Sequence, residues 1–541
     1  MATRRPSVTI NSAFGGIAPS QYYIQEGQYL AGIGIDPQWP ISDSVGDRFI
    51  SGSLRPTAYA EFSGANITGN PYWILNNPKN ANTYVYANDG KVVSYDSAFG
   101  TETLVGTPTS GAGNGAAYYN NYLYFATPTN VSRYGPLDGS PSLTNTYWTS
   151  TLSLTALVNT TYPSIRGSGV IPNHAMHVHV DNKLYICDYD STSSTAATRG
   201  RGLIHALATT YGSAEGDTNN SSSYNALDLP LGYMPVDIES YGNYVVIAAI
   251  QSTNATVIQG KAALFFWDGI NASFYNVVHL PDPLVTALIN KNGELYVFSG
   301  SVSTGTDSSN GYRVSKYLGG QSLETVYYSD VGSPPLAGAV DAQGDRLIWG
   351  TFTQINSTTA GSPEYYPVVM ALGTKSPAVP GGIHCIAKAS GTGTAGDGIV
   401  TAVKQIEQAS MASPRVIIGW RDSSGYGVDK STTTYATSVW RSRMFNVGKK
   451  FAIRMIRIPL GTAVGANMTI TPKIFLDDFS SSSTSGLTVI NNTNYANSER
   501  TVQMHPDISG NNSFCLELRF SGTALLPVKF PIVIEFDVLE D

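Results

Sequence analysis

The chain has 541 residues, only 13% of them charged, and its formal net charge is −7. This acidic balance argues against a protein whose main task is to hold nucleic acid tightly, because such proteins carry a basic excess. It still allows a protein whose surface lines a channel through which nucleic acid passes. Abundant Gly (54) and Tyr (33) favour β structure with many turns. The best helical candidate is the short segment 400–411.

The start of the chain carries charge from Met1 to Pro6 but no apolar stretch after it, so no secretory signal is expected. No apolar run approaches the roughly 18 residues that a membrane span needs. The odd number of cysteines, Cys187, Cys385 and Cys515, predicts reduced, buried thiols. We therefore expect a protein made in a cytoplasm, with no membrane span and no cofactor.

Residues 1–70 come first and contain Gly and Pro too densely for long elements, as in Phe14-Gly-Gly-Ile-Ala-Pro19. Tyr, Trp, Ile and Leu are nevertheless too frequent here for a segment that never packs. We expect an extended N-terminal arm that lies on its own propeller or on a neighbouring subunit.

The central part of the chain repeats one pattern seven times: a turn of Asn, Asp or Gly leads into a short β-branched or aromatic strand. The seven strands begin at Tyr84, Leu123, Leu184, Tyr244, Leu295, Leu347 and Val416, in steps of 39, 61, 60, 51, 52 and 69 residues. A further strand often follows, at 131–134, 202–207, 262–267, 312–317 and 366–371. This is the period of propeller blades. Residues 71–435 are predicted to form a β-propeller of about seven blades, or of six if the last unit belongs elsewhere.

Residues 436–541 change to strict alternation of apolar and polar residues. In one strand Phe514, Leu516, Leu518 and Phe520 alternate with Cys515, Glu517 and Arg519, and residues 530–538 repeat the pattern. Alternation is typical of antiparallel strands with one buried and one wet face. With further candidates at 441–447, 451–458, 468–476 and 487–490, it predicts a separate β-sandwich or jelly-roll-like domain.

Histidines gather before one of the predicted strands. His177 and His179 are two residues apart, so on a strand they share a face and could bind a metal ion together with Asp188 across the next turn. No recognised ligand spacing is matched. A polar strand face lining the propeller channel or an interface is therefore the favoured interpretation, and no metal site is predicted.

No coherent catalytic set is found. Asp188 and Asp190 can share a strand face, but no nucleophile elbow or phosphate-cradling loop accompanies them. We expect no enzymatic activity.

Six basic residues fall within 17 positions near the start of the last domain. They are Arg441, Arg443, Lys449, Lys450, Arg454 and Arg457. They could face nucleic acid or an acidic partner, but no aromatic residues interleave with them to stack on bases. We favour a subunit interface or a plain solvated strand face.

Both ends of the chain carry a family resemblance. The opening Phe14-Gly-Gly-Ile-Ala-Pro19 with Gly34-Ile-Asp36 resembles the start of many tail proteins of tailed bacteriophages. So does Ile418-Gly-Trp-Arg-Asp-Ser-Ser-Gly-Tyr-Gly-Val-Asp429, followed by Phe445-Asn-Val-Gly-Lys-Lys-Phe-Ala-Ile-Arg-Met-Ile-Arg-Ile-Pro459. Propellers also occur in the nozzle proteins that ring the tail channel of short-tailed phages. The resemblance implies a virion part present in several copies.

We therefore expect a non-enzymatic structural component of a phage tail, nozzle, tail-tip or collar-like, in a virion assembled in a host bacterial cytoplasm. The implied partners are other tail proteins and further copies of this chain around the tail axis, with DNA passing non-specifically. The alternative is a module of the tail that binds a glycan or receptor on the host surface. A propeller glycosidase ranks third.

Overall fold

The computed structural model is all-β. Its strands are joined by turns and, within the described residues, by a single 3₁₀ turn, η1 (Ala337–Ala339). In that part of the chain no helix is long and apolar enough to cross a membrane. The structure describes residues 5–18, 24–37, 53–62, 64–78, 82–109, 111–128, 130–145, 147, 174–190, 201–208, 223–254, 257–300, 311–343, 346–356, 363–373, 381–391, 398–406, 415–422, 425–432 and 435–539.

Seven four-stranded antiparallel units account for the described strands between residues 71 and 431, and the last of them takes its fourth strand from the N-terminal arm. In order the units are β6 (Pro71–Asn76), β7 (Thr83–Ala87), β8 (Val92–Tyr95) and β9 (Glu102–Gly106); β10 (Gly115–Tyr119), β11 (Tyr122–Ala126), β12 (Val131–Gly135) and β13 (Ser142–Thr144); β14 (Met176–Val178), β15 (Lys183–Asp190), β16 (Arg201–Ala208) and β17 (Ser223–Leu231); β18 (Tyr233–Tyr241), β19 (Tyr244–Asn254), β20 (Val257–Trp267) and β21 (Asn276–His279); β22 (Leu284–Lys291), β23 (Glu294–Gly300), β24 (Tyr312–Gly319) and β25 (Ser322–Ser329); β26 (Val340–Gln343), β27 (Arg346–Asn356), β28 (Pro363–Gly373) and β29 (Gly382–Lys388); and β30 (Ile399–Ile406), β31 (Arg415–Arg421), β32 (Tyr426–Ser431) and β5 (Tyr59–Glu61).

The repeat in the sequence marks one strand of each unit. All seven predicted strands are the second strands of their units, and the five further strands are third strands. The expected tight turns are present as well: Asn121, Asn182, Gly242 and Asn292 all have positive φ, a conformation that Asn and Gly tolerate at low cost. These predictions are confirmed.

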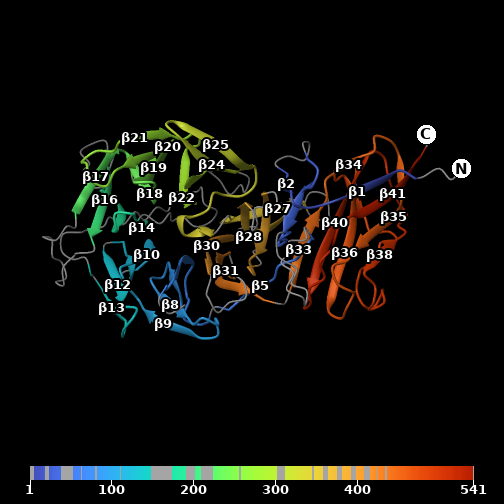
Figure 1. Ribbon diagram of the computed structural model, residues 1–541, viewed down its shortest axis with the longest axis horizontal. Coiled ribbons are helices and arrows are strands. Elements are labelled where there is room, and N and C mark those ends of the chain that lie inside the picture. The colour runs from blue at the N-terminus through green and yellow to red at the C-terminus, as the bar shows by residue number, and fades with distance from the viewer. Residues whose placement is uncertain are drawn as a thin grey trace.

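The units close into a ring (Figure 1). Each first strand contacts the first strand of the next unit, from β6 through β10, β14, β18, β22 and β26 to β30, and β30 contacts β6 again. This closed cycle of small antiparallel sheets is a β-propeller. Stacking around a ring buries both faces of every sheet and leaves only short edges.

The segment proposed as a helix is instead a first strand of the propeller. Residues 399–406 form β30, and residues 407–414 lie outside the described part of the chain. Ile399, Val400, Ala402 and Val403 are all buried. A strand buried on both faces reads as a continuous apolar run, which periodicity alone cannot separate from a buried helix. The helix prediction is therefore wrong.

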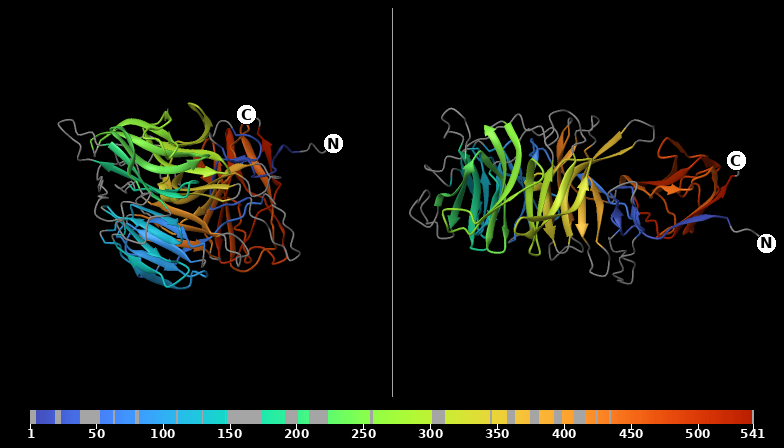
Figure 2. Two further views of the ribbon diagram at one scale, coloured as in Figure 1. Left: turned by 60° about the vertical axis from the view of Figure 1, so that its left-hand side comes forward. Right: turned by 90° about the horizontal axis from the view of Figure 1, so that it is seen from above.

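The C-terminal part consists of two sheets at one side of the propeller (Figure 2). One contains β1 (Ser7–Ile10), β41 (Ile532–Val538), β35 (Phe451–Pro459), β38 (Thr501–Met504) and β39 (Ile508–Gly510); the other contains β37 (Ser481–Ser483), β36 (Met468–Leu476), β40 (Ser513–Gly522), β33 (Tyr435–Arg441), β4 (Ala31–Ile33) and β34 (Phe445–Asn446). The two sheets share one apolar core, to which Ile456 and Ile534 contribute from the first and Ile470 and Leu516 from the second.

The N-terminal arm adds strands to both parts of the molecule. β1 pairs with β41 and β4 pairs with β33 in the C-terminal sheets, whereas β2 (Gly16–Ile17), followed by β3 (Gln28–Tyr29), extends the propeller unit of β29 in parallel. β5 then pairs with β32 and completes the last propeller unit. The range 1–70 thus supplies a propeller strand in addition to an arm.

Backbone contact between the arm and the propeller depends on a glycine. Gly16 has a φ of +75°, and a Cβ atom there would lie 2.4 Å from the carbonyl oxygen of Ile383. A side chain at this position would strain the backbone and separate β2 from β29. Gly16, the second glycine of the Phe14–Pro19 motif, is therefore required for docking of the arm.

Candidate interaction site at the junction of the propeller and the C-terminal sheets

The sheet that contains β40 is covered on both faces. The alternation in residues 514–520 places Cys515, Glu517 and Arg519 on a wet strand face, whereas the cysteine count predicts a buried Cys515. Cys515 and Glu517 are 0% exposed, so the alternation is wrong for both residues and the buried thiol is confirmed. One face of the sheet lies in the shared core, and the other faces the propeller unit of β28. Its charged side chains must therefore find partners inside the molecule.

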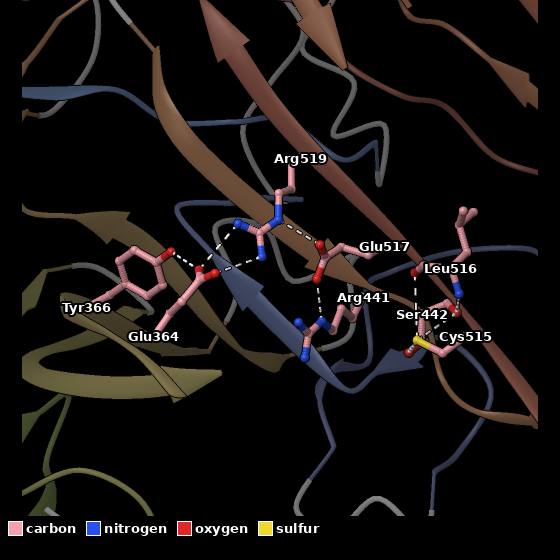
Figure 3. Close-up of polar contacts among 8 residues, drawn as sticks. All are labelled: Glu364, Tyr366, Arg441, Ser442, Cys515, Leu516, Glu517 and Arg519. Atoms are coloured by element: carbon pink, nitrogen blue, oxygen red, sulfur yellow. Dashed lines mark hydrogen bonds and ion pairs between the residues drawn. The ribbon is translucent and has the colours of Figure 1, made fainter. Parts of the chain in front are cut away.

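A chain of ion pairs crosses this junction (Figure 3). Glu364 on β28 accepts hydrogen bonds from both terminal nitrogens of Arg519 on β40, each at 3.3 Å. Arg519 Nε donates to Glu517 Oε1 at 2.7 Å, and Glu517 Oε2 accepts from Nε of Arg441 on β33. Tyr366 donates its hydroxyl proton to Glu364 on the propeller side. These contacts connect β28 of the propeller to β40 and β33.

Strand register explains the order of the charges. Arg441 on β33 and Lys473 on β36 are paired with Glu517, one on each side of β40. Residues directly opposite each other on one sheet face are close enough for opposite charges to attract. Since Glu517 is fully buried and Arg441 is 3% exposed, removal of Glu517 would leave the buried guanidinium of Arg441 without the carboxylate that it faces.

Positive charge exceeds negative charge in this cluster. Four cations (Arg441, Arg519, Lys388 and Lys473) surround two carboxylates (Glu364 and Glu517). Burial lowers the pKa of Lys388, whose ammonium lies 4.7 Å above the ring of Tyr366. Burial also opposes the charge on Arg519, but Glu517 and Glu364 outweigh it and raise the pKa of Arg519 above its ordinary value. The cluster is therefore held together by its carboxylates.

Uncharged contacts continue the junction along β40 (Figure 3). The backbone N–H of Leu516 donates to Ser442 Oγ at 3.0 Å, and the Cys515 thiol donates to the Ser442 carbonyl oxygen at 3.3 Å. All three cysteines are buried and unbridged, as predicted. Burial raises the pKa of the Cys515 thiol to about 12, so the thiol stays protonated near neutral pH and is chemically inert.

A second polar contact fixes the arm to the propeller. The guanidinium of Arg346, at the start of β27, donates two parallel hydrogen bonds to the carboxylate of Asp36, both at 3.0 Å. Asp36 is 2% and Arg346 is 5% exposed. Nearby, the Tyr29 hydroxyl lies 2.9 Å from Nδ1 of His384 on β29. The arm is thus held by a buried bidentate ion pair as well as by strand pairing.

The six basic residues proposed as an interface lie in different places. Arg441 is buried at the junction, and Arg454 on β35 forms an ion pair with Asp537 at 2.7 Å. Arg443 is half-buried beside the ring of Phe445 at 5.1 Å. The remaining three, Lys449, Lys450 and Arg457, are exposed. One of the six therefore belongs to the junction, and the set does not form a single face.

The proposed metal residues also separate. His177 Nε2 and His179 Nδ1 both lie within hydrogen-bond distance of Ser240 Oγ, at 2.7 and 2.8 Å. Asp188 instead faces His205 at 3.2 Å and His174 at 3.7 Å. Within the described residues no group of three His, Cys, Asp or Glu side chains has the geometry to hold a metal ion. Ser240 lies on β18, so the two histidines connect neighbouring propeller units.

Sequence reasoning missed most of the junction. Glu364, Tyr366 and Lys388 lie in strands whose pattern shows no functional signal, and the pairing of Asp36 with Arg346 joins residues 310 positions apart. Glu517 and Arg519 were visible only as the polar half of an alternating strand. Their burial follows from how the two parts pack, which the local pattern does not contain.

Similarity to known proteins is limited to solved structures of low sequence identity. No family model and no curated protein matches the chain. Among solved structures, the β-propeller domain of Cps50 (Swd1) from Myceliophteria thermophila is 9% identical and covers 69% of this chain and 99% of its own, with a TM-score of 0.40. The WD40 domain of Neurospora crassa Pan2 is 9% identical over 69% and 94%, with a TM-score of 0.38. An exo-β-1,3-galactanase from Phanerochaete chrysosporium is 12% identical over 93% and 100%, with a TM-score of 0.27.

Buried titratable groups predict a nearly constant stability between about pH 4.5 and pH 6.5 and a decline above pH 6.5. Burial lowers the pKa of His177 to about 4 and of His384 to about 3, so their contribution is complete above the unfolded value of about 6.5 and is lost as pH falls from there. Burial raises the pKa of Asp237 to about 8 and of Glu239 to about 7. Their contribution is therefore complete below the unfolded values of about 4 and is lost as pH rises through the folded values, which offsets the gain from the histidines up to about pH 6.5.

The measurement is the thermal unfolding temperature between pH 4 and pH 9, which should change little between about pH 4.5 and pH 6.5 and fall above pH 6.5. Asp237→Asn, which removes one ionisation on β18, should flatten the decline above pH 6.5. An unfolding temperature that still rises from pH 6.5 to pH 8 in the unaltered protein would contradict this assignment.

Proposed function

We propose that this chain is a non-enzymatic structural subunit of a bacteriophage tail, nozzle, tail-tip or collar-like, built as a seven-bladed β-propeller joined to a C-terminal β-sandwich. In this proposal several copies surround the tail axis in the virion, contact other tail proteins, and leave a passage for DNA. The chain would be synthesised in the host bacterial cytoplasm and carried in the released particle.

The observation that carries the proposal is the path of the arm. Its strands enter a propeller unit and both C-terminal sheets, and the buried pair of Asp36 and Arg346 fixes it between them. Contacts between domains usually permit relative motion unless they are extensive. Here shared strands and buried ion pairs make the two parts one stiff body, which suits a permanent building block.

Residues that carry the resemblance to tail proteins support this structural role. Gly16 and Asp36 dock the arm, and Asp429 accepts hydrogen bonds from Ser390 and from Trp420 inside the last propeller unit. The motifs therefore coincide with positions that hold the fold together, as expected when the shared property is architecture.

A buried group of titratable side chains supports a non-enzymatic role. The carboxylate of Asp188 lies 3.7 Å from His174 Nδ1 and 3.2 Å from His205 Nε2, and His174, His205 and Asp188 are 0%, 3% and 2% exposed. A substrate must reach the groups that act on it. This cluster is shielded by the propeller units and serves packing.

The proposal is tested by asking whether the chain assembles. Purified protein should form closed oligomers by sedimentation velocity at micromolar concentration, and mass spectrometry should find the chain in purified particles of the phage that encodes it. Electron microscopy of those particles should place it around the tail axis. A chain that stays monomeric at every concentration and is absent from particles would overturn the proposal.

A further inference from the structure

A cavity of about 140 Å³ lies where the arm covers the edge of the propeller. One wall is formed by arm residues around Ala18 and Ala31, and another by Tyr328 and Asp330 at the end of β25. The floor is formed by β27, from which Gln354 reaches the cavity. Because three segments far apart in the sequence form it, the cavity exists only when the arm is docked.

The lining combines apolar surface with polar groups that can accept and donate hydrogen bonds. Ile17, Ile355 and Met370 supply the apolar part. Among the residues that the structure describes, no hydrogen bond engages the Gln354 amide or the Asp330 carboxylate, and Tyr328 is 50% exposed. An amide and a carboxylate that are free beside an aromatic ring match a ligand with many hydroxyl groups and an apolar face.

The walls of the cavity are fixed before any ligand enters. The ring of Tyr327 packs against Tyr312 at 5.8 Å and against Trp349 at 6.0 Å. Arg313, held by Asp282 at 3.1 Å, lies 5.9 Å above the ring of Tyr328. Binding at such a site loses little conformational entropy of the protein, which favours even a small ligand.

We propose that this cavity binds a single pyranose unit of a glycan. Pockets that enclose drug-sized ligands measure roughly 300–1,000 Å³, so a cavity of about 140 Å³ accepts one sugar ring and leaves the rest of a glycan outside. Asp330 accepts hydrogen bonds from ring hydroxyls, Gln354 both donates and accepts, and the apolar floor contacts the C–H face of the ring. The site goes beyond the proposed structural role and does not depend on it.

The experiment uses the full chain and a panel of methyl glycosides of hexoses, N-acetylhexosamines and deoxyhexoses. Saturation-transfer NMR should detect at least one glycoside, with a dissociation constant of about 1 mM, as expected for a ligand of this size. Asp330→Asn and Gln354→Ala should each weaken binding by about tenfold, and Ala18→Phe, which fills the cavity, should abolish it. Asp507→Asn, at an exposed carboxylate in the loop between β38 and β39 of the C-terminal part, serves as the matched control and should leave binding unchanged.

The unfolding temperature of every variant checks that loss of binding is not loss of fold, since Gln354 and Asp330 are not core residues. The proposal is overturned if no glycoside of the panel binds, or if binding survives in both Asp330→Asn and Ala18→Phe. Either result leaves the assembly of the chain into particles unaffected, so this failure can be told apart from failure of the structural proposal.

Discussion

Glu517→Gln is expected to destabilise the C-terminal sheets by about 3–5 kcal/mol, the usual cost of removing one partner from a buried ion pair. The substitution keeps the volume of the side chain but removes a carboxylate that contacts both Arg441 and Arg519. Arg441, 3% exposed, would then remain charged in a buried position. Urea unfolding followed by tryptophan fluorescence should show the loss as an earlier transition of the C-terminal part.

Two further variants separate the effect of charge from that of packing. Glu499→Gln removes an exposed carboxylate in the same part of the chain and should change stability by less than about 0.5 kcal/mol. Glu517→Leu combined with Arg441→Met should recover most of the lost stability, because an apolar pair of similar volume often replaces a buried ion pair without cost. A Glu517→Gln protein as stable as the Glu499→Gln protein would refute the assigned role of the junction.

Most of the propeller could be predicted because its second strands follow tight turns. Asn120–Asn121 and Asn292–Gly293 have positive φ angles, which few other residue types adopt. These residue pairs therefore predict a tight turn and a strand directly after it. First strands have no such signal. β30 has buried residues on both faces, and its apolar run resembled a helix. β5, separated by more than 360 residues from its partner β32, could not be assigned to the propeller from its own three residues.

A β-bulge recurs in the first strands of several propeller units, although the units differ in length. First strands carry an extra residue near their beginning in four units, between Pro71 and Trp73, Pro235 and Asp237, Val285 and Ala287, and Val400 and Ala402. Such bulges bend and twist a strand, which suits strands that must pack around a common axis. No shared residue type marks the position, so the sequence repeat does not reveal it.

The sequence could have given a better prediction of which histidine lies opposite Asp188. The turn at Asp181–Asn182 sets a register in which Met176 pairs with Ile186 and Val178 with Leu184. Extending that register by two residues places His174, not His177 or His179, opposite Asp188. The shared face of His177 and His179 was predictable from strand periodicity; their common partner Ser240, from the next unit, was not.

Asp36→Asn should release the arm and cost about 3–5 kcal/mol, because it leaves the guanidinium of Arg346 buried without its counter-charge. Both terminal nitrogens of Arg346 donate to Asp36. The amide of an asparagine at position 36 can accept only one of these two hydrogen bonds, because its NH₂ group is itself a donor and would face a donor of Arg346. Urea unfolding measures the energy, and the rate at which trypsin cleaves the arm measures its release.

Glu26→Gln is the matched control, since Glu26 is an exposed carboxylate on the same arm whose contact is with Asn11, also on the arm; it should leave both readouts unchanged. Release of the arm would also open the cavity beside Ala18 and detach β4 from β33, so loss of glycoside binding should accompany faster cleavage in Asp36→Asn. If Asp36→Asn matches the control in both stability and cleavage, strand pairing alone holds the arm, and the buried ion pair contributes specificity rather than strength.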